Sequence, residues 1–362
     1  MEKILNDIYP IFLGEEALGE IVKVISQGKY SSIFILTDEN VNIHCLPVLL
    51  SKSEELKNAF IIEIPPGEEE KNITISAKVI SVLLENNADR KSLLINFGGG
   101  VIGDLGGFTA SVYKRGICFI NIPTTLLSMV DASVGGKNGI NFLERKNIIG
   151  TFTNPEAVFI FPDFIKTLLP RETRSGYAEI LKHILLSDAG RWKSIQNNVP
   201  DFLNEKNLTD LISHSVKFKV DITKDDFKEE SKRMILNFGH TIGHAIESFS
   251  YQANEPLMHG EAIAAGMISE LYLSKKLAGF PETEMLPVIR FIRSVFPDIH
   301  LNCNPEDLIP FLYADKKNSR DKIAFSLLKA PGVPAGVVYP DLEFIVESLI
   351  FLNEEFSRVG IQ

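Results

Sequence analysis

Apolar and polar positions alternate along the first half of the chain in a pattern typical of strands separated by helices. Short apolar runs, each ending at turn-forming residues, predict strands at 32–37, 60–64, 92–97 and 118–122. Between them, residues 72–86 carry apolar side chains at helical intervals. Strands that alternate with helices indicate a parallel sheet covered on both faces. We therefore expect a Rossmann-like α/β domain over residues 1–169.

The second half has long amphipathic stretches instead of short runs. Helices are predicted at 171–186, 207–222, 234–249 and 260–277. The last of these stops before Gly279 and Pro281, which is typical of a helix end. Two short apolar runs at 324–328 and 335–339 predict strands. We expect residues 170–362 to form a mainly α-helical domain.

Composition narrows the class of protein. A chain of 362 residues with 45% hydrophobic content can bury a large core. We find no apolar run long enough to span a bilayer and no signal-peptide pattern. The three cysteines are widely spaced and odd in number, so neither a disulfide framework nor a thiolate zinc site is indicated. We expect a cytoplasmic protein that does not act at a membrane.

The formal net charge is −10, which argues against a nucleic-acid-binding protein. The residues that we nominate for function below are nevertheless mostly Lys and Arg. Basic side chains in a cleft of an acidic protein would select a small anionic substrate over a long polyanion.

Three of the seven histidines, His240, His244 and His259, lie close together in a helical stretch. Upstream, Glu179 and Lys182 are three positions apart, on one helical face. Glu179, His240 and His259 would form a set of two histidines and one carboxylate, as in open catalytic zinc sites. The HExxH signature is absent. A hydrogen-bonded core or surface histidine is the alternative at each position, and the residues alone leave both interpretations open.

A glycine-rich run at 98–104 follows a predicted strand and opens a helix, the setting of a dinucleotide phosphate loop. Glycines allow close approach of pyrophosphate, and the helix N-terminus supplies free N–H donors. The acidic ribose ligand expected after the next strand is missing at 120–123. The acidic loop 67–71 is a candidate substitute, and a solvated helix start is the alternative interpretation of that loop.

A second glycine-rich segment, 131–141, is followed by Lys146 and Asn147. It is not a Walker A loop, because the GxxxxGK spacing is absent and Lys137 is followed by Asn138, not by Ser or Thr. Glycines beside two lysines suit close contact with a phosphate or carboxylate. A flexible surface loop is the alternative.

Taken together, these motifs resemble the 3-dehydroquinate synthase family. The matching runs are 98–104, 113–116, 123–127, 130–137, 176–182, 236–245 and 259–262, in the order of the family. The resemblance extends from Asp38 to Lys317. It implies an N-terminal NAD-binding α/β domain, a helical metal- and substrate-binding domain, and a divalent metal, zinc or cobalt.

The resemblance also implies a role for each matching residue. The metal ligands would be Glu179, His240 and His259. NAD would be held by Asp38, Asn40, Glu68, Lys71, Gly99, Gly100, Val101, Asp104, Thr124 and Thr125, with Lys137 and Lys146. This assignment places the ribose on the Glu68 loop and accounts for the missing acid. Substrate would be surrounded by Arg115, Asp131, Lys137, Lys146, Asn147, Lys182, Lys219, Arg233, Asn237, His244 and Lys316.

The family reaction converts the seven-carbon sugar acid phosphate DAHP into 3-dehydroquinate, the second step of the shikimate pathway. It proceeds by transient oxidation with NAD, phosphate elimination, re-reduction, ring opening and aldol closure. We expect phosphate mainly on Arg115, Lys137, Asn147 and Arg233, and carboxylate on Lys219 and Lys316. His244, one turn after His240, would bond near the metal or phosphate without being a ligand.

Three departures from the family pattern leave every proposed ligand in place: Asn138, the pair Ser231–Lys232, and Asn154. The alternatives are sister cyclases acting on sedoheptulose 7-phosphate or glucose 6-phosphate, and the polyol and glycerol-1-phosphate dehydrogenases. A non-catalytic protein that keeps the scaffold is the alternative from another class. The resemblance also suggests a homodimer.

Overall fold

The computed structural model describes residues 1–5, 8–143, 145–197, 205–253, 255–301, 303–314 and 322–357. The chain forms two compact units, Met1–Thr173 with Leu203–Lys228, and Arg174–Phe202 with Glu229–Gln362. The sequence predicted two domains with a single boundary at 169/170. The assignment of NAD to the first domain and of metal and substrate to the second stays a prediction.

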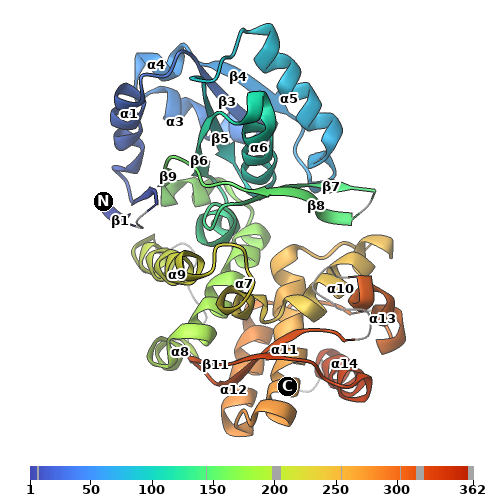
Figure 1. Cartoon of the computed structure of the whole chain (residues 1–362). Coiled ribbons are helices and arrows are strands. Elements are labelled where there is room, and N and C mark those ends of the chain that lie inside the picture. Colours follow the sequence, from blue (N-terminus) through green and yellow to red (C-terminus); the bar gives the residue numbers. More distant parts are fainter. Residues whose placement is uncertain are drawn as a thin grey trace. The chain divides into compact units, whose positions relative to one another are not determined.

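The first unit contains a seven-stranded sheet in the order β1-β2-β9-β6-β5-β3-β4 (Figure 1). The strands are β1 (Glu2–Leu5), β2 (Pro10–Leu13), β3 (Ile33–Asp38), β4 (Phe60–Ile64), β5 (Leu93–Gly98), β6 (Cys118–Pro123) and β9 (Val158–Ile160). All neighbours are parallel except β1 and β2. The parallel sheet predicted from the apolar runs is confirmed.

Helices cover both faces of this sheet. They are α1 (Ala17–Gly28), α2 (Glu39–His44), α3 (Leu46–Leu50), α4 (Glu54–Lys57), α5 (Ile73–Glu85) and α6 (Gly100–Val112). Right-handed crossovers place α5 and α6 opposite α1–α4, because the chain reverses direction across the sheet after β4. On the α5–α6 side, Phe34 and Leu94 of the strands share a buried core with Val79 and Leu105 of the helices.

The second unit is mainly helical, as predicted. It contains most of α7 (Pro170–Ser187), with α8 (Ala189–Ile195), α10 (His240–Gln252), α11 (His259–Ala278), α12 (Glu282–Val295), α13 (Pro305–Ala314) and α14 (Leu342–Ser357). A hairpin of β10 (Phe325–Ala330) and β11 (Val333–Val338) completes it. Helix α11 is buried along most of its length and contacts α10, α12, α14 and β10. None of the described helices is long and apolar enough to cross a membrane.

One local prediction needs correction, and one open alternative is decided. The single helix expected over 234–249 is instead the 3-10 turn η5 (Lys232–Asn237) followed by α10, because Gly239 adopts a φ of 80°. The end of the glycine-rich segment 131–141, for which a flexible loop was the alternative, lies in β7 (Lys137–Phe142), which forms a hairpin with β8 (Arg145–Phe152). Apolar periodicity continues across Gly239, and the pattern therefore could not show that a new helix begins at His240.

Candidate active site

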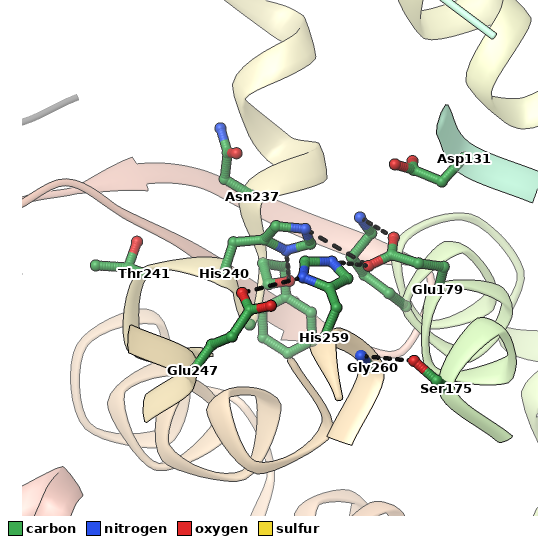
Figure 2. A network of polar contacts seen from close by, with 12 residues as sticks. Asp131, Ser175, Glu179, Asn237, His240, Thr241, Glu247, His259 and Gly260 are labelled. Carbon is green, nitrogen blue, oxygen red and sulfur yellow. Dashed lines mark hydrogen bonds and ion pairs between the residues drawn. The ribbon is translucent and has the colours of Figure 1, made fainter. Parts of the chain in front are cut away.

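Three helices of the second unit bring Glu179, His240 and His259 together (Figure 2). Glu179 lies within α7, whereas His240 and His259 are the first residues of α10 and α11. The Nε2 atoms of His240 and His259 lie 3.5 and 3.7 Å from Oε1 of Glu179. One ligand atom from each residue falls within 4.8 Å of the others. The structure thus gathers the three residues that the resemblance implied as metal ligands.

The other ring nitrogen of each histidine faces an oxygen. His240 Nδ1 lies 3.2 Å from the carbonyl oxygen of Phe238, and His259 Nδ1 lies 3.4 Å from Oε2 of Glu247. Metal-binding histidines usually donate this second N–H to a carbonyl or carboxylate, which fixes the tautomer and aims the free nitrogen at the metal. The described donor set therefore fits a divalent cation such as zinc.

The charges in the cluster also favour a cation. Glu179 is fully buried and forms an ion pair with the buried Lys182. Burial alone would lower the pKa of His259, but the carboxylates of Glu247 and Glu179 raise it to about 10. A site that holds a proton on a buried imidazole so strongly stabilises positive charge, and a divalent cation would satisfy the same carboxylates.

A second group, His244, Glu247 and His259, also has three ligand atoms within 4.8 Å. It shares His259 with the first group. Because His259 Nδ1 faces Glu247 while its Nε2 faces Glu179, we take Glu247 as the carboxylate that orients His259. The centroid of the His244 ring lies 5.2 Å from the centroid of the His240 ring and 5.9 Å from that of the His259 ring. His244 is thus beside the ligand cluster, as the resemblance implied.

Two glycines allow these helices to approach closely enough to form the cluster. A Cβ atom at Gly266 would lie 2.1 Å from the carbonyl oxygen of Gly239, and one at Gly260 would lie 1.9 Å from that of Ser175. No side chain fits at either distance. The Gly260 N–H donates to Ser175 Oγ at 3.0 Å, which joins the start of α11 to α7 (Figure 2).

The 3-10 turn η5 carries two further candidates, Arg233 and Asn237, both buried. The Asn237 amide donates to Oε1 of Glu229 at 2.9 Å. Glu229 itself has a φ of 62°, unusual for a residue with a side chain. Neither Glu229 nor Glu247 was a candidate from the sequence. Spacing could have indicated Glu247, because it follows His240 by seven residues and so lies on the same helical face.

In the first unit, the candidate nucleotide ligands gather at the carboxyl ends of parallel strands. Asp38 ends β3 and accepts the Val41 N–H at 3.0 Å, so that it also caps α2, which carries Asn40. Gly98 ends β5, and its carbonyl accepts the Thr124 N–H at 3.0 Å just beyond β6. Gly99 is the N-cap residue of α6, and Gly100 and Val101 are the first residues of that helix. Open α/β sheets bind their ligands at this edge, outside the strand ends.

Lys71 joins the acidic loop to two other candidates. It is buried, and its Nζ lies 2.5 Å from Oδ2 of Asp104 and 2.7 Å from Oδ1 of Asn147. Burial raises the pKa of the Asp104 carboxyl, and the positive charge of Lys71 opposes that rise. The loop is therefore not simply a solvated helix start, because its lysine is built into the core of the candidate site.

Asn141 connects the same loop to the hairpin. Its amide nitrogen donates to Oε1 of Glu68 at 2.9 Å, and its Oδ1 accepts the Asn147 N–H at 3.0 Å. Asn147 has a φ of 52°, which this contact helps to maintain. Asn141 ends the glycine-rich segment 131–141, and no role was predicted for it. Its position beside both Glu68 and Asn147 becomes visible only in the folded chain.

The remaining candidates are distributed as follows. Lys219 on α9 (Glu205–Asp225) reaches Oδ1 of Asp131 at 2.6 Å, and Asp131 lies on the π-helical turn η3 (Ser128–Ala132). Arg115 is exposed, and no hydrogen bond or ion pair joins its side chain to another described residue. Lys137 is exposed and Lys146 half-buried on the hairpin. Lys316 lies outside the described residues.

Solved structures with this fold form one class of two-domain α/β and helical proteins. A structure of 2-deoxy-scyllo-inosose synthase complexed with carbaglucose-6-phosphate, NAD+ and Co2+ matches with a TM-score of 0.85 and 24% identity over 96% of each chain. ValA, the 2-epi-5-epi-valiolone synthase of Streptomyces hygroscopicus subsp. jinggangensis 5008, was solved with NAD+ and Zn2+ bound. It also matches with a TM-score of 0.85 and 24% identity, over 98% of this chain and 99% of that protein.

Sequence likeness identifies the family within this class. The family model described as 3-dehydroquinate synthase N-terminal matches residues 61–175, and the C-terminal model matches residues 176–318. The 3-dehydroquinate synthase of Parabacteroides distasonis is 41% identical over 348 residues, which cover 96% of this chain and 98% of that protein. The chain belongs to the 3-dehydroquinate synthase family.

Proposed function

We propose that this protein converts DAHP into 3-dehydroquinate and phosphate with catalytic NAD and a bound divalent metal, zinc or cobalt. The observation that carries the proposal is the cluster of Glu179, His240 and His259, each histidine oriented by a second acceptor. Membership of the family supplies the reaction, and the cluster supplies a place for the metal that the reaction uses.

The metal would be held by Glu179 Oε1 and the two Nε2 atoms. When bound, a divalent cation supplies Lewis acidity toward substrate oxygens. The ion pair of Lys182 with Glu179 offsets part of the negative charge of the ligand set. Glu247 holds the proton of His259 on Nδ1 and leaves Nε2 available as a ligand.

NAD would be held at the strand ends of the first unit by the residues that the resemblance implied. Free N–H groups at the start of α6 suit its pyrophosphate, and Asp38 and Glu68 suit ribose hydroxyls. When bound, NAD supplies reversible hydride acceptance. Lys71 orients this region by contacting Asp104 and Asn147 at the same time.

The substrate is a dianion or more, and the proposed contacts are cationic. Arg233 suits a bidentate hold on an oxyanion, whereas Lys137, Lys146 and Lys219 act as point charges. Lys219 is already paired with Asp131, and we propose that substrate carboxylate takes over part of this charge. The division of phosphate and carboxylate among these residues, including Arg115, Asn147 and Lys316, belongs to the proposal. So do a homodimeric state, which the resemblance suggests, and a cytoplasmic location, which the composition suggests.

The test is release of phosphate from DAHP by zinc- or cobalt-loaded protein with NAD far below the substrate concentration. We expect many turnovers per NAD, no accumulation of NADH, and 3-dehydroquinate identified by mass and NMR. Glucose 6-phosphate and sedoheptulose 7-phosphate are tested in parallel. Turnover of either in place of DAHP would move the protein to a sister cyclase, and stoichiometric NADH would indicate a dehydrogenase.

A further inference from the structure

We propose that Glu270 is a positioning residue that sets the affinity of the metal site by fixing the start of α10, where His240 lies. The inference rests on the proposed metal function. Glu270 is fully buried on α11. Its Oε2 accepts the Gly239 N–H at 2.7 Å, and its Oε1 accepts the N–H groups of Thr241 at 3.1 Å and Ile242 at 3.3 Å.

These N–H donors belong to residues on both sides of the metal ligand His240 in the sequence. Gly239 and Thr241 flank His240, and the first N–H groups of a helix have no acceptor within that helix. The residue at the N-cap position, Gly239, offers no side-chain acceptor. Glu270 meets this requirement from a different helix, with hydrogen bonds strengthened by its charge and by the helix dipole. The backbone on both sides of His240 is thus tied to one carboxylate.

Helix α11 also carries the second histidine ligand. His259 is its first residue, and Glu270 follows about three turns later. A single helix therefore presents one ligand directly and fixes the backbone of the other. Gly266 of α11 contacts the start of α10 so closely that an added Cβ would meet the Gly239 carbonyl. The start of α10 therefore has little room to move while Glu270 holds it.

Substitution at Glu270 should therefore weaken metal binding without touching a ligand. Glu270→Gln keeps the size of the side chain, but it puts an NH2 group against a backbone N–H and removes the charge. Glu270→Ala leaves three N–H groups in a buried place without their acceptor, which is unfavourable. In both variants the start of α10 relaxes, and the Nε2 atom of His240 loses its fixed position relative to Glu179.

A matched control lies one residue away. Ser269 is also fully buried on α11, but its hydroxyl bonds to Ser348 of α14 at 2.9 Å, not to α10. Ser269→Ala removes a buried hydrogen bond from the same helix and leaves the start of α10 intact. It separates general loss of stability from a specific effect on the metal ligands.

The experiment measures zinc dissociation constants by chelator competition, well below the melting temperature, and the visible absorption spectrum of the cobalt-loaded proteins. We expect Glu270→Gln to bind zinc about 10- to 100-fold more weakly than wild type, the range for groups that orient metal ligands. Its cobalt spectrum should differ, while Ser269→Ala keeps wild-type affinity and spectrum. Glu270→Ala should show a larger loss, and Glu270→Gln decides the matter where Glu270→Ala does not fold.

Two other outcomes are separable. Wild-type zinc affinity and an unchanged cobalt spectrum in Glu270→Gln, whatever its melting temperature, would overturn the role of Glu270 and leave the metal site standing. A wild-type protein that binds no zinc or cobalt would overturn the proposed metal function itself.

Discussion

The metal cluster of the second unit and the Lys71 cluster of the first unit prepare for ligands in opposite ways. At the metal cluster, three ligand atoms already converge, and the second nitrogen of each histidine faces an oxygen. At the other cluster, Lys71 is already bonded to Asp104 and Asn147. At the first cluster the ligand atoms are already in place, and a cation has to displace the proton that the carboxylates hold on His259. At the second cluster a ligand must compete with the existing side-chain bonds of Lys71. The preformed geometry of the metal cluster favours high affinity for a cation. The paired charges of the Lys71 cluster favour selectivity, because only a ligand that replaces those bonds can bind there.

The largest expected effect comes from removing a metal ligand. His259→Ala or Glu179→Ala should lose bound metal, and kcat/KM should fall at least about 10³-fold. The reason is that the two remaining ligands are too few to hold a catalytic cation. Metal content is measured by elemental analysis after gel filtration, and activity by phosphate release. A folded variant that retains both metal and activity contradicts the ligand assignment.

Arg233→Ala should come next, with a loss of about 10²-fold in kcat/KM from the missing charge-assisted contact to a substrate oxyanion. Metal content should stay at the wild-type level, because Arg233 lies on η5 and is not a ligand. Arg233→Lys should recover only part of the loss, since a lysine cannot bind an oxyanion bidentately. Unchanged kinetics in Arg233→Ala would remove this residue from the substrate site.

Asn141→Ala tests the connecting role within the first unit. Losing its part-buried bond to Glu68 and its exposed bond to the Asn147 backbone should raise KM for NAD about tenfold at most, in line with a net contribution of about 0.5–1.5 kcal/mol per hydrogen bond. Metal affinity should not change, because the metal ligands lie in the other unit. An equal loss of zinc affinity would show that the two clusters are not independent.

The smallest effect concerns the exposed ion pair between Glu2 of β1 and Lys217 of α9. Hydrogen bonds from Lys217 and Ser213 lower the pKa of Glu2, so this pair stabilises the fold above the ordinary pKa of 4.5 and loses its effect as the pH falls through the lowered value. Exposed pairs contribute about 0–1 kcal/mol. Glu2→Gln should therefore reduce the free energy of unfolding slightly at pH 7 and by less at pH 3, as measured by urea unfolding. A large effect at pH 7 would mean that the pair is not the exposed contact described.

Much of the fold could be predicted from periodicity. Strands β3 to β6 and helices α5, α7 and α11 begin and end within two residues of the predicted ranges. The start of α10 could not, because only the backbone conformation of Gly239 divides an otherwise continuous helical pattern. Local pattern reports which face is buried and says little about where one helix stops and the next begins.

The candidate site divides along similar lines. Residue type and spacing raised a two-histidine, one-carboxylate set but could not choose it over core histidines, and the resemblance made the choice. Asn141, Glu247 and Glu270 were not nominated, because each acts on a partner that only tertiary packing brings near. The proposed ligand-binding residues stand in recognisable sequence motifs. The residues that position them, such as Glu247 and Glu270, do not.

The return of α9 to the first unit has a consequence for the order in which the chain is made. Residues Leu203–Lys228 belong with Met1–Thr173, and Lys219 of α9 contacts Asp131. During synthesis from the N-terminus, the α/β unit therefore lacks one of its helices until residue 228 has left the ribosome, by which time part of the second unit has already emerged. A fragment ending at residue 169 would remain in this unfinished state, so neither unit can be produced intact by cutting the gene once.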